Sequence, residues 1–252
     1  MASYHKELKY SLIARMLPPN NESISSISKE TGIPKSTLSE WKKKALENRN
    51  TEMDEIVNMP KTKRGQVTLE KLCLAAETLF YQKGYNNTSI VDITNLSGIG
   101  LGTFYIYFKD KYLLYKYLLL RYSHLIRKEI RDATIGLESR VEKERVGLKT
   151  FLKFIRENKH AYNIIWESLY IDKTLFINYY DNFAERYAKG IIEAQECGEM
   201  EAYDPMVVSY FLMGVSNFIG LKYVMFDENN MDYDYVVDQV VDMLFNGMFK
   251  KK

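Results

Sequence analysis

Residues 88–111 read TSIVDITNLSGIGLGTFYIYFKDK, and this stretch decides the fold. Ser89 can cap a helix whose third residue is Asp92, which is the arrangement of a capping box. That helix is expected to end at Gly98, because the tight turn that follows needs a residue that tolerates positive φ. A second helix is expected to begin near Leu101. Two short helices joined by such a turn predict a helix-turn-helix, whose second helix lies in the major groove of DNA.

The second helix has two chemically different sides. Phe104 and Phe108 are four residues apart, which places them on one face and predicts that they anchor the helix to a core. For Phe108 the core position is favoured, whereas Tyr107 fits the core and the surface equally well. The other side carries small, hydroxyl-bearing and aromatic residues, namely Gly102, Thr103, Tyr105 and Tyr107.

The run TFYIYFKDK after LSGIG resembles the signature of TetR/AcrR-type transcriptional regulators. The resemblance begins near Thr68 and is strong through about Leu114, and the rest of the chain agrees with that family in length and helical character. It implies that the DNA groove is faced by Leu101, Gly102, Thr103, Tyr105, Ile106 and Tyr107. It also implies phosphate contacts for Thr103, Tyr105 and Lys111, with Ser89 as a further candidate beside its capping role.

The implied base readers are unusual because they include no Arg, Lys, Gln or Asn. Leu101 and Ile106 can touch thymine methyl groups, and Gly102 allows close approach of the backbone. The pattern therefore gives little basis for hydrogen-bonded readout of bases. We expect the shape of the DNA, or help from another part of the chain, to supply specificity.

The composition excludes several classes of protein. The chain has 252 residues, which suits one to three small domains, and it has no apolar run of the roughly 18 residues that a membrane span needs. Its start lacks an apolar signal core, and Cys73 and Cys197 are too few for a disulfide framework, so a reducing, cytoplasmic location is expected. No metal-ligand spacing, phosphate loop or nucleophile elbow occurs, so we expect no enzyme, no cofactor and no metal.

The net charge of +2 conceals a polarity along the chain. Residues 1–124 hold 18 Lys and Arg against 12 Asp and Glu, whereas residues 125–252 hold 17 against 21. A basic front and an acidic rear suit a protein that binds a polyanion with one end only. A well-solvated mixed surface would give the same tally, so that alternative stays open.

Apolar residues recur at helical spacing throughout the chain, and no convincing alternating strand is found. The chain is therefore expected to be all-α, with four parts: an extra small helix-turn-helix domain at 1–50, a linker at 51–65, a TetR-like DNA-binding domain at 66–112, and a ligand-binding and dimerisation domain at 113–252. The linker ends in a basic run that either contacts phosphates or forms a solvated tether, namely Lys61, Thr62, Lys63 and Arg64.

Part of the helix-turn-helix pattern occurs twice, with an offset of 66 positions. ISSIS with TGI in residues 24–33 matches IVDIT with SGI in residues 90–99, and Leu38 matches Phe104. The match has a physical basis, because crossing helices require a small residue, a turn residue and an apolar plug at these places. A second helix-turn-helix is therefore predicted in the N-terminal part.

RMLPPNN followed by SISKETGIPKSTLSEWKKKA resembles the DNA-binding head of insertion-sequence transposases, over roughly residues 5–50. No acidic triad on a strand-rich scaffold follows, so the resemblance implies DNA binding and not strand transfer. The lysines at 42–44 either contact DNA or form a solvated helix end. The positions expected to contact DNA are Lys35, Ser36, Thr37, Ser39 and Lys43.

The rear part of the chain is rich in aromatic residues. In TetR-like proteins, helices in this region enclose a cavity for a small inducer, and rings with few polar groups suit a hydrophobic or planar ligand. The alternative is that the aromatic stripe packs a solid core. The residues expected to line the pocket are Trp166, Tyr170, Phe176, Tyr179, Tyr180, Phe183 and Tyr187.

Two late segments, residues 206–226 and 236–249, are apolar over so wide a band that they must be covered. We expect them to pair with the same segments of a second copy in a four-helix bundle, as the TetR resemblance also implies. The expected interface residues are Val208, Phe211, Val215, Phe218, Val237, Val241, Leu244 and Met248.

These features predict a cytoplasmic, homodimeric, TetR-like regulator, in the commoner case a repressor, that binds a double-stranded DNA operator and no membrane. A small hydrophobic or aromatic inducer would release it by preferring a state in which the recognition helices are wrongly spaced. The competing hypothesis is a non-switching DNA-architectural or assembly protein whose rear part only dimerises.

Overall fold

The computed structural model describes residues 12–13, 15–16, 22–43, 56–226 and 232–248. Every regular element in these ranges is helical, which confirms the expected all-α class. The chain divides into two compact units, Met1–Met59 and Pro60–Lys252. Parts of the predicted segments 1–50, 51–65 and 113–252 lie outside the described residues.

The N-terminal unit is built around helix α2, Ile24–Thr31. Ser23 caps its start by accepting a hydrogen bond from the Ser26 amide at 3.1 Å, and Gly32 ends it in the left-handed conformation at φ 69°. Residues 35–43 form a further helix. The buried core of this unit consists of Leu12, Met16, Ile27, Ile33, Leu38 and Trp41.

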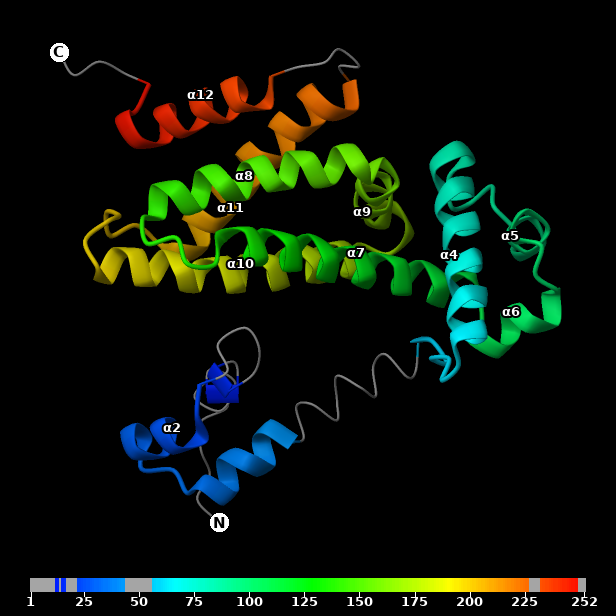
Figure 1. Ribbon diagram of the computed structural model, residues 1–252, viewed down its shortest axis with the longest axis horizontal. Helices are drawn as coiled ribbons and strands as arrows, with labels where there is room; N and C mark the ends of the chain where they lie inside the picture. The colour runs from blue at the N-terminus through cyan, green and yellow to red at the C-terminus, as the bar shows by residue number, and fades with distance from the viewer. Residues whose placement is uncertain (1–11, 14, 17–21, 44–55, 227–231, 249–252) are drawn as a thin grey trace. The chain divides into compact units, whose positions relative to one another are not determined.

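Three helices form the front of the second unit. Figure 1 shows α4 (Lys63–Lys83), α5 (Ile90–Ser97) and α6 (Leu101–Tyr107) together at one end of the long helix α7 (Lys111–Thr134). Thr62 caps α4 by accepting from the Gly65 amide, and Asp110 caps α7 by accepting from the Leu113 amide. These caps satisfy amides that have no partner inside their own helix.

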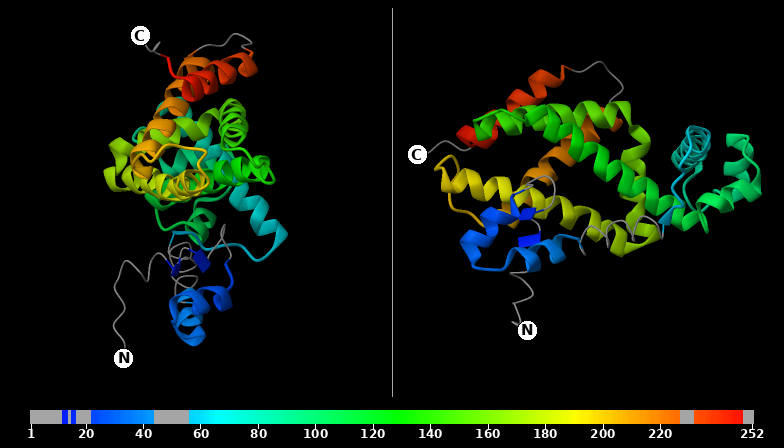
Figure 2. Two further views of the ribbon diagram at one scale, coloured as in Figure 1. Left: turned by 90° about the vertical axis from the view of Figure 1, so that its left-hand side faces the viewer. Right: turned by 60° about the horizontal axis from the view of Figure 1, so that its bottom comes forward.

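The rear of the second unit is a helical bundle. Helix α7 packs against α8, α10 packs against both α9 and α11, and α12 packs against α8. Figure 2 shows in its right-hand view how α7 leads from the front helices into this bundle. The elements are α8 (Arg140–Glu157), α9 (Lys159–Ile171), α10 (Lys173–Glu196), α11 (Pro205–Gly220), the π-helix η1 (Leu221–Phe226) and α12 (Tyr233–Asn246).

An aromatic cluster joins the front helices to the bundle. The ring of Tyr115 in α7 lies 5.6 Å from Phe80 of α4 and 5.1 Å from Tyr85 in the turn after α4. The Tyr115 hydroxyl donates to the carbonyl oxygen of Ile164 in α9 at 2.5 Å. Because Phe80 and Tyr115 are fully buried, this cluster fixes how α4, α7 and α9 cross.

Among the described residues, one helical stretch, Pro205–Phe226, is long and apolar enough to cross a membrane by length and composition. It comprises α11 and η1, and α11 packs on one side against α8 and α10. Phe211 and Phe218 remain exposed. A helix that packs against its own bundle and shows an apolar band on the other side fits an interface with another protein surface.

Gly98 provides a test of the turn between α5 and α6. Gly98→Ala is expected to lower the free energy of unfolding by about 1–2 kcal/mol, because an L residue is strained at φ +66°. A Cβ atom there meets nothing within 4 Å, so a clash does not contribute. Gly98→Asn is the control, since Asn tolerates this conformation better. Urea unfolding followed by far-UV circular dichroism measures both, and equal losses would contradict the prediction.

Candidate nucleic-acid interface

The start of α5 is held by a capping box and an ion pair. The Ser89 hydroxyl accepts from the Asp92 amide at 3.1 Å, and the Asp92 carboxylate accepts from the Ser89 amide at 2.8 Å, which confirms the predicted cap. Lys83 Nζ lies 2.9 Å from the same carboxylate. The lysine, and then the Ser89 amide and hydroxyl, hold the pKa of Asp92 well below its ordinary value. Ser89 itself stays exposed.

The turn after α5 is set by backbone hydrogen bonds. The Gly98 amide donates to the carbonyl oxygen of Asn95 at 3.3 Å, and the Ile99 amide donates to that of Thr94 at 3.1 Å. Gly98 has the positive φ that the sequence predicts. Gly100 then precedes α6 and offers no side-chain cap. The first-turn amides of α6 therefore have no acceptor from a capping side chain.

Helix α6 buries one face and exposes the other. Phe104 and Phe108 are buried with ring centroids 5.8 Å apart, which confirms both predicted core positions. Phe108 also lies 5.6 Å from the ring of Tyr117 in α7. Gly102 is exposed. The large side chains on the outer face are 45% exposed for Leu101, 53% for Tyr105 and 59% for Ile106.

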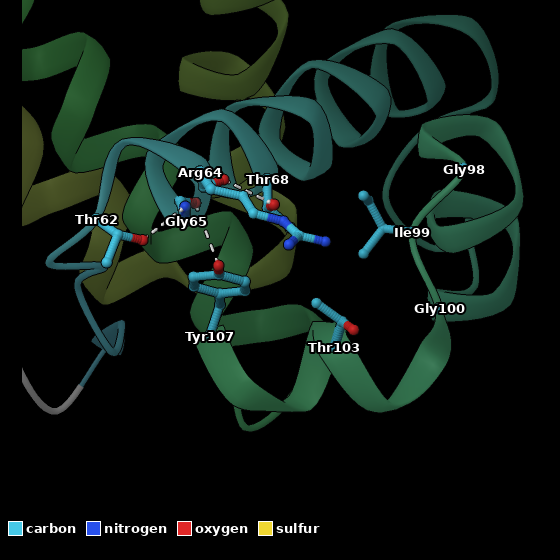
Figure 3. A pocket seen from close by; sticks show the side chains of 9 residues that line it. All are labelled: Thr62, Arg64, Gly65, Thr68, Gly98, Ile99, Gly100, Thr103 and Tyr107. Carbon is cyan, nitrogen blue, oxygen red and sulfur yellow. Dashed lines mark hydrogen bonds between the residues drawn. The ribbon is translucent and has the colours of Figure 1, made fainter.

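Thr103 and Tyr107 are half-buried. The Tyr107 hydroxyl donates to the carbonyl oxygen of Gly65 at 3.2 Å, which ties α6 to the first turn of α4. Tyr107, which fitted core and surface equally well in the sequence, is therefore a link between two helices. Figure 3 shows the open pocket of about 400 Å³ beside this link, lined by Thr62, Arg64, Gly65, Thr68, Gly98, Ile99, Gly100, Thr103 and Tyr107.

Arg64 is the only charged residue among those that line this pocket. Figure 3 shows its guanidinium group reaching from α4 toward Ile99 and Thr103. The sequence places Arg64 in a basic run ahead of the domain, whereas the structure places it in the first turn of α4. A guanidinium beside the turn of a helix-turn-helix suits a phosphate oxygen.

Lys111 is predicted as a phosphate contact from the sequence. Its Nζ donates to the carbonyl oxygens of Tyr85 and Thr88, at 2.7 Å each, and lies 4.0 Å from the centre of the Tyr85 ring. Burial lowers its pKa. Two of its three donors thus hold the turn between α4 and α5, and a phosphate contact through the third stays a prediction.

Three long-range polar contacts near the junction of the front helices with the bundle had no signal in the sequence. Glu167 of α9 accepts from the Tyr85 amide at 2.7 Å, and the Asn163 side chain donates to the Phe80 carbonyl oxygen at 3.3 Å. The Tyr112 hydroxyl donates to Asp172 at 2.6 Å. Burial raises the pKa of Glu167. The partners are 60 to 83 positions apart in the chain, so no local pattern reveals them.

The aromatic residues predicted to line a pocket come from α9 and α10. Ring centroids are 6.2 Å apart for Trp166 and Phe176, and 4.8 Å apart for Phe176 and Tyr180. Tyr170 is 84% exposed, because it lies in the last turn of α9 where no other helix covers it, so it does not line an interior pocket. The other six are half-buried: Trp166, Phe176, Tyr179, Tyr180, Phe183 and Tyr187.

Some polar side-chain atoms in this aromatic region have hydrogen-bond partners and others have none. Trp166 Nε1 is buried and has no hydrogen-bond partner among the described residues. Tyr187, in contrast, donates to Glu144, which also pairs with Arg140. Burial raises the pKa of the Tyr180 hydroxyl. Trp166 Nε1 and Arg140 Nε, the latter on an arginine that packs over the Tyr187 ring, are therefore donors with capacity for an acceptor on a ligand.

The predicted interface residues divide between the surface and the core. Val237 and Val241 are buried, because α12 lays this face on α8 of the same chain, so they offer no surface to a partner. Val208 and Val215 are half-buried. Phe245, which belongs to the predicted interface segment 236–249, is 71% exposed. The predicted residues with exposed side chains are Phe211, Phe218, Leu244 and Met248.

In the N-terminal unit the predicted DNA-contacting residues lie on the helix at 35–43. Its buried residues are Leu38 and Trp41. Thr37 is half-buried. The exposed residues among those predicted are Lys35, Ser36, Ser39 and Lys43.

Comparisons with known proteins match both parts of the second unit. The family model of the bacterial regulatory proteins of the tetR family matches residues 72–118, which run from α4 into α7. The HTH-type transcriptional activator FasR of Mycolicibacterium smegmatis is 21% identical over 188 residues, which are 74% of this chain and 83% of FasR.

Two solved structures share the fold. The fatty acid degradation regulator FadR from Bacillus halodurans has a TM-score of 0.65 and 17% identity, and the match covers 74% of this chain and 97% of FadR. A Clostridium perfringens protein assigned as a fatty acid metabolism regulator has a TM-score of 0.63 and 18% identity, and the match covers 72% of this chain and 100% of that protein.

The matched family model spans the helix-turn-helix whose outer face is exposed. The shared fold extends over the helical bundle behind it. Residues 72–118 are therefore similar to the DNA-binding domain of the tetR family, and the chain is similar to transcriptional regulators of TetR type, whose fold it shares.

Proposed function

We propose that this regulator is a homodimeric repressor that occupies its operator through α6 and leaves it when a hydrophobic ligand binds the rear bundle. The exposed outer face of α6 is the observation that supports DNA binding by this helix. Buried Phe104 fixes the roll of the helix, and exposed Leu101 and Ile106 would otherwise be apolar surface in water. A duplex in contact with this face removes that surface from water.

The chemistry of α6 favours readout by shape and by methyl groups. Leu101 and Ile106 fit thymine methyl groups, and the hydroxyls of Thr103 and Tyr105 fit phosphates. Arg64 adds a cation on the α4 side of the same surface. The helix itself carries no charged residue, so we infer that sequence-dependent DNA shape contributes much of its specificity.

The homodimer rests on the uncovered apolar side of α11 and on the end of α12. Phe211 and Phe218 lie on the first, and Leu244, Phe245 and Met248 lie on or just beyond the second. A two-fold axis through this surface makes the interface self-complementary. A dimer that binds a palindromic operator would need its two copies of α6 roughly 34–36 Å apart, one DNA turn.

The ligand class follows from the aromatic residues of α9 and α10. Half-buried rings beside the unsatisfied donor Trp166 Nε1 suit a long apolar molecule that carries an oxygen acceptor. The similarity to the fatty acid degradation regulator FadR supports an acyl chain as that molecule. A planar aromatic compound is the other ligand that these rings suit.

The proposed regulator catalyses no reaction. Among the described residues, no three His, Cys, Asp or Glu side chains form a group that could hold a metal ion. A repressor acts by occupying DNA, so it needs no surface that contacts RNA polymerase. The proposed location is the cytoplasm, where the chromosome lies. Because the similar protein FasR is an activator, the sign of regulation is measured with a reporter gene behind the operator.

The coupling between ligand and operator runs through the junction of α9 with the turn after α4. Glu167 holds the Tyr85 amide, and Tyr85 also carries Lys111 on its ring and carbonyl oxygen. A ligand that shifts α9 beside Trp166 therefore moves an acceptor that positions α4 and α5. The shift in operator affinity equals the difference in ligand affinity between the two states.

Ligand control is tested by operator affinity in the presence of defined probes. Palmitate is the acyl probe and 1-naphthol the planar one, and the operator is a duplex selected from random sequence by the full chain. Palmitate is expected to raise the melting temperature and to weaken operator binding about tenfold or more. A stabilising probe that leaves operator affinity unchanged would support a non-switching architectural protein instead. If neither probe binds, the ligand class is wrong.

Gly102→Ala is expected to change the stability of the protein and its operator affinity in opposite directions. Gly102 lies exposed inside α6, and a Cβ atom there meets nothing within 4 Å. We expect alanine to raise the free energy of unfolding by about 0.5–1 kcal/mol, because glycine is a poor helix former. Operator affinity is expected to fall, because the new methyl group meets the DNA backbone. Unchanged affinity, measured by fluorescence anisotropy on the selected duplex, would show that no close approach occurs at Gly102.

Glu167→Ala tests the coupling. This variant is expected to bind palmitate and the operator separately, while palmitate no longer weakens operator binding, because the Tyr85 amide then has no side-chain acceptor. Glu167→Gln keeps an acceptor oxygen and is expected to retain the response. Glu157→Ala changes an exposed carboxylate at the end of α8 and is the matched control. A normal response in Glu167→Ala, with the fold intact by circular dichroism, would exclude this route.

A further inference from the structure

We propose that the N-terminal unit, through the helix at residues 35–43, is a second head that contacts double-stranded DNA. Each protomer would then present two helix-turn-helix units to one stretch of duplex. The N-terminal unit resembles the helix-turn-helix of α5 and α6 in the same chain. The second head goes beyond the operator contact of α6, since nothing in the tetR family match at residues 72–118 includes this unit.

The two units have the same local geometry at a constant offset of 66 positions. Helix α2 runs over Ile24–Thr31 and α5 over Ile90–Ser97, so both have eight residues and both bounds differ by 66. Each begins with a serine whose hydroxyl accepts an amide hydrogen bond. Each ends at a left-handed glycine, with φ 69° at Gly32 and φ 66° at Gly98.

The cores of the two units match at the same offset. Ile27 and Ile93 are both completely buried on the first helix of their unit. Leu38 and Phe104 are both completely buried on the second helix, which starts at residue 35 in one unit and at Leu101 in the other. The buried plug fixes the roll of each second helix. The helix at 35–43 therefore exposes the face that corresponds to the outer face of α6.

The exposed face of the N-terminal helix supplies the positive charge that α6 lacks. Lys35, Ser36 and Ser39 occupy the places of Leu101, Gly102 and Tyr105. The helix at 35–43 carries three lysines against one glutamate, whereas α6 has no charged residue. Lysine and serine side chains donate hydrogen bonds to phosphates and base edges, which is the chemistry that a polyanionic duplex requires.

Two carboxylates of the unit are engaged elsewhere, which favours a basic contact surface. Arg15 donates to Glu22 at 2.8 Å through Nε and to Glu30 at 2.8 Å through Nη1. The Arg15–Glu30 pair joins the segment before α2 to α2 itself.

Lys35→Glu in the full chain tests this second head. Lys35 begins its helix, where a glutamate interacts favourably with the helix dipole, so the fold is expected to persist. Lys29→Glu is the matched control, because it makes the same charge change at an exposed lysine on α2. Both variants are measured on the duplex selected by the full chain, by DNase I footprinting and by anisotropy at several salt concentrations.

For Lys35→Glu we expect about tenfold weaker binding and a shorter footprint. The slope of log affinity against log salt is expected to fall by about 0.9 for each phosphate that the variant no longer neutralises. Lys29→Glu is expected to stay within about twofold of the unchanged chain. If the two variants behave alike in affinity, salt slope and footprint, the second head is refuted while binding through α6 stands. If the unchanged chain selects and protects no duplex, both proposals fall.

Discussion

The burial of Phe104 is the contact on which the DNA-binding surface depends. Helix α6 has only seven residues, too few to hold its orientation by its own backbone hydrogen bonds. The buried ring of Phe104, packed beside Phe108, therefore sets the roll of the helix. Removing such a ring costs about 3–5 kcal/mol. The same contact that stabilises the front helices thus decides that Leu101, Tyr105 and Ile106 face outward.

Local features of this region follow from the sequence because each depends on neighbours within a few positions. The capping box of Ser89 and Asp92, the left-handed Gly98 and the spacing of Phe104 and Phe108 are all of this kind, and all are confirmed. Each has a strong physical preference that tertiary packing does not override. The bounds of α5 and α6 are fixed by the same local preferences.

Features that depend on which helix covers which face do not follow from the sequence. Val237 and Val241 belong to an apolar stripe as suitable for a partner as for a core, and only the packing of α12 on α8 decides between them. Tyr170 shares the composition of its aromatic neighbours, yet its place in the last turn of α9 leaves it in solvent. Lys111 donates to backbone carbonyl oxygens. Every residue has such an oxygen, so the identity of the residues in the sequence does not predict these contacts.

The junction at Tyr85 is the route by which the proposed ligand would act on α6. Half-buried Glu167 has one carboxylate oxygen on the Tyr85 amide and the other without a partner among the described residues, and burial raises its pKa. Such a group is held by a single contact, so a small displacement of α9 leaves a half-buried amide unsatisfied, at a cost of about 1–3 kcal/mol. That energy corresponds to roughly a 5- to 150-fold change in affinity, which is the usual range of coupling between two sites. In the proposed switch a change of this size would need no deformation of α6, because buried Phe104 would keep the orientation of α6 while α4, α5 and α6 move together.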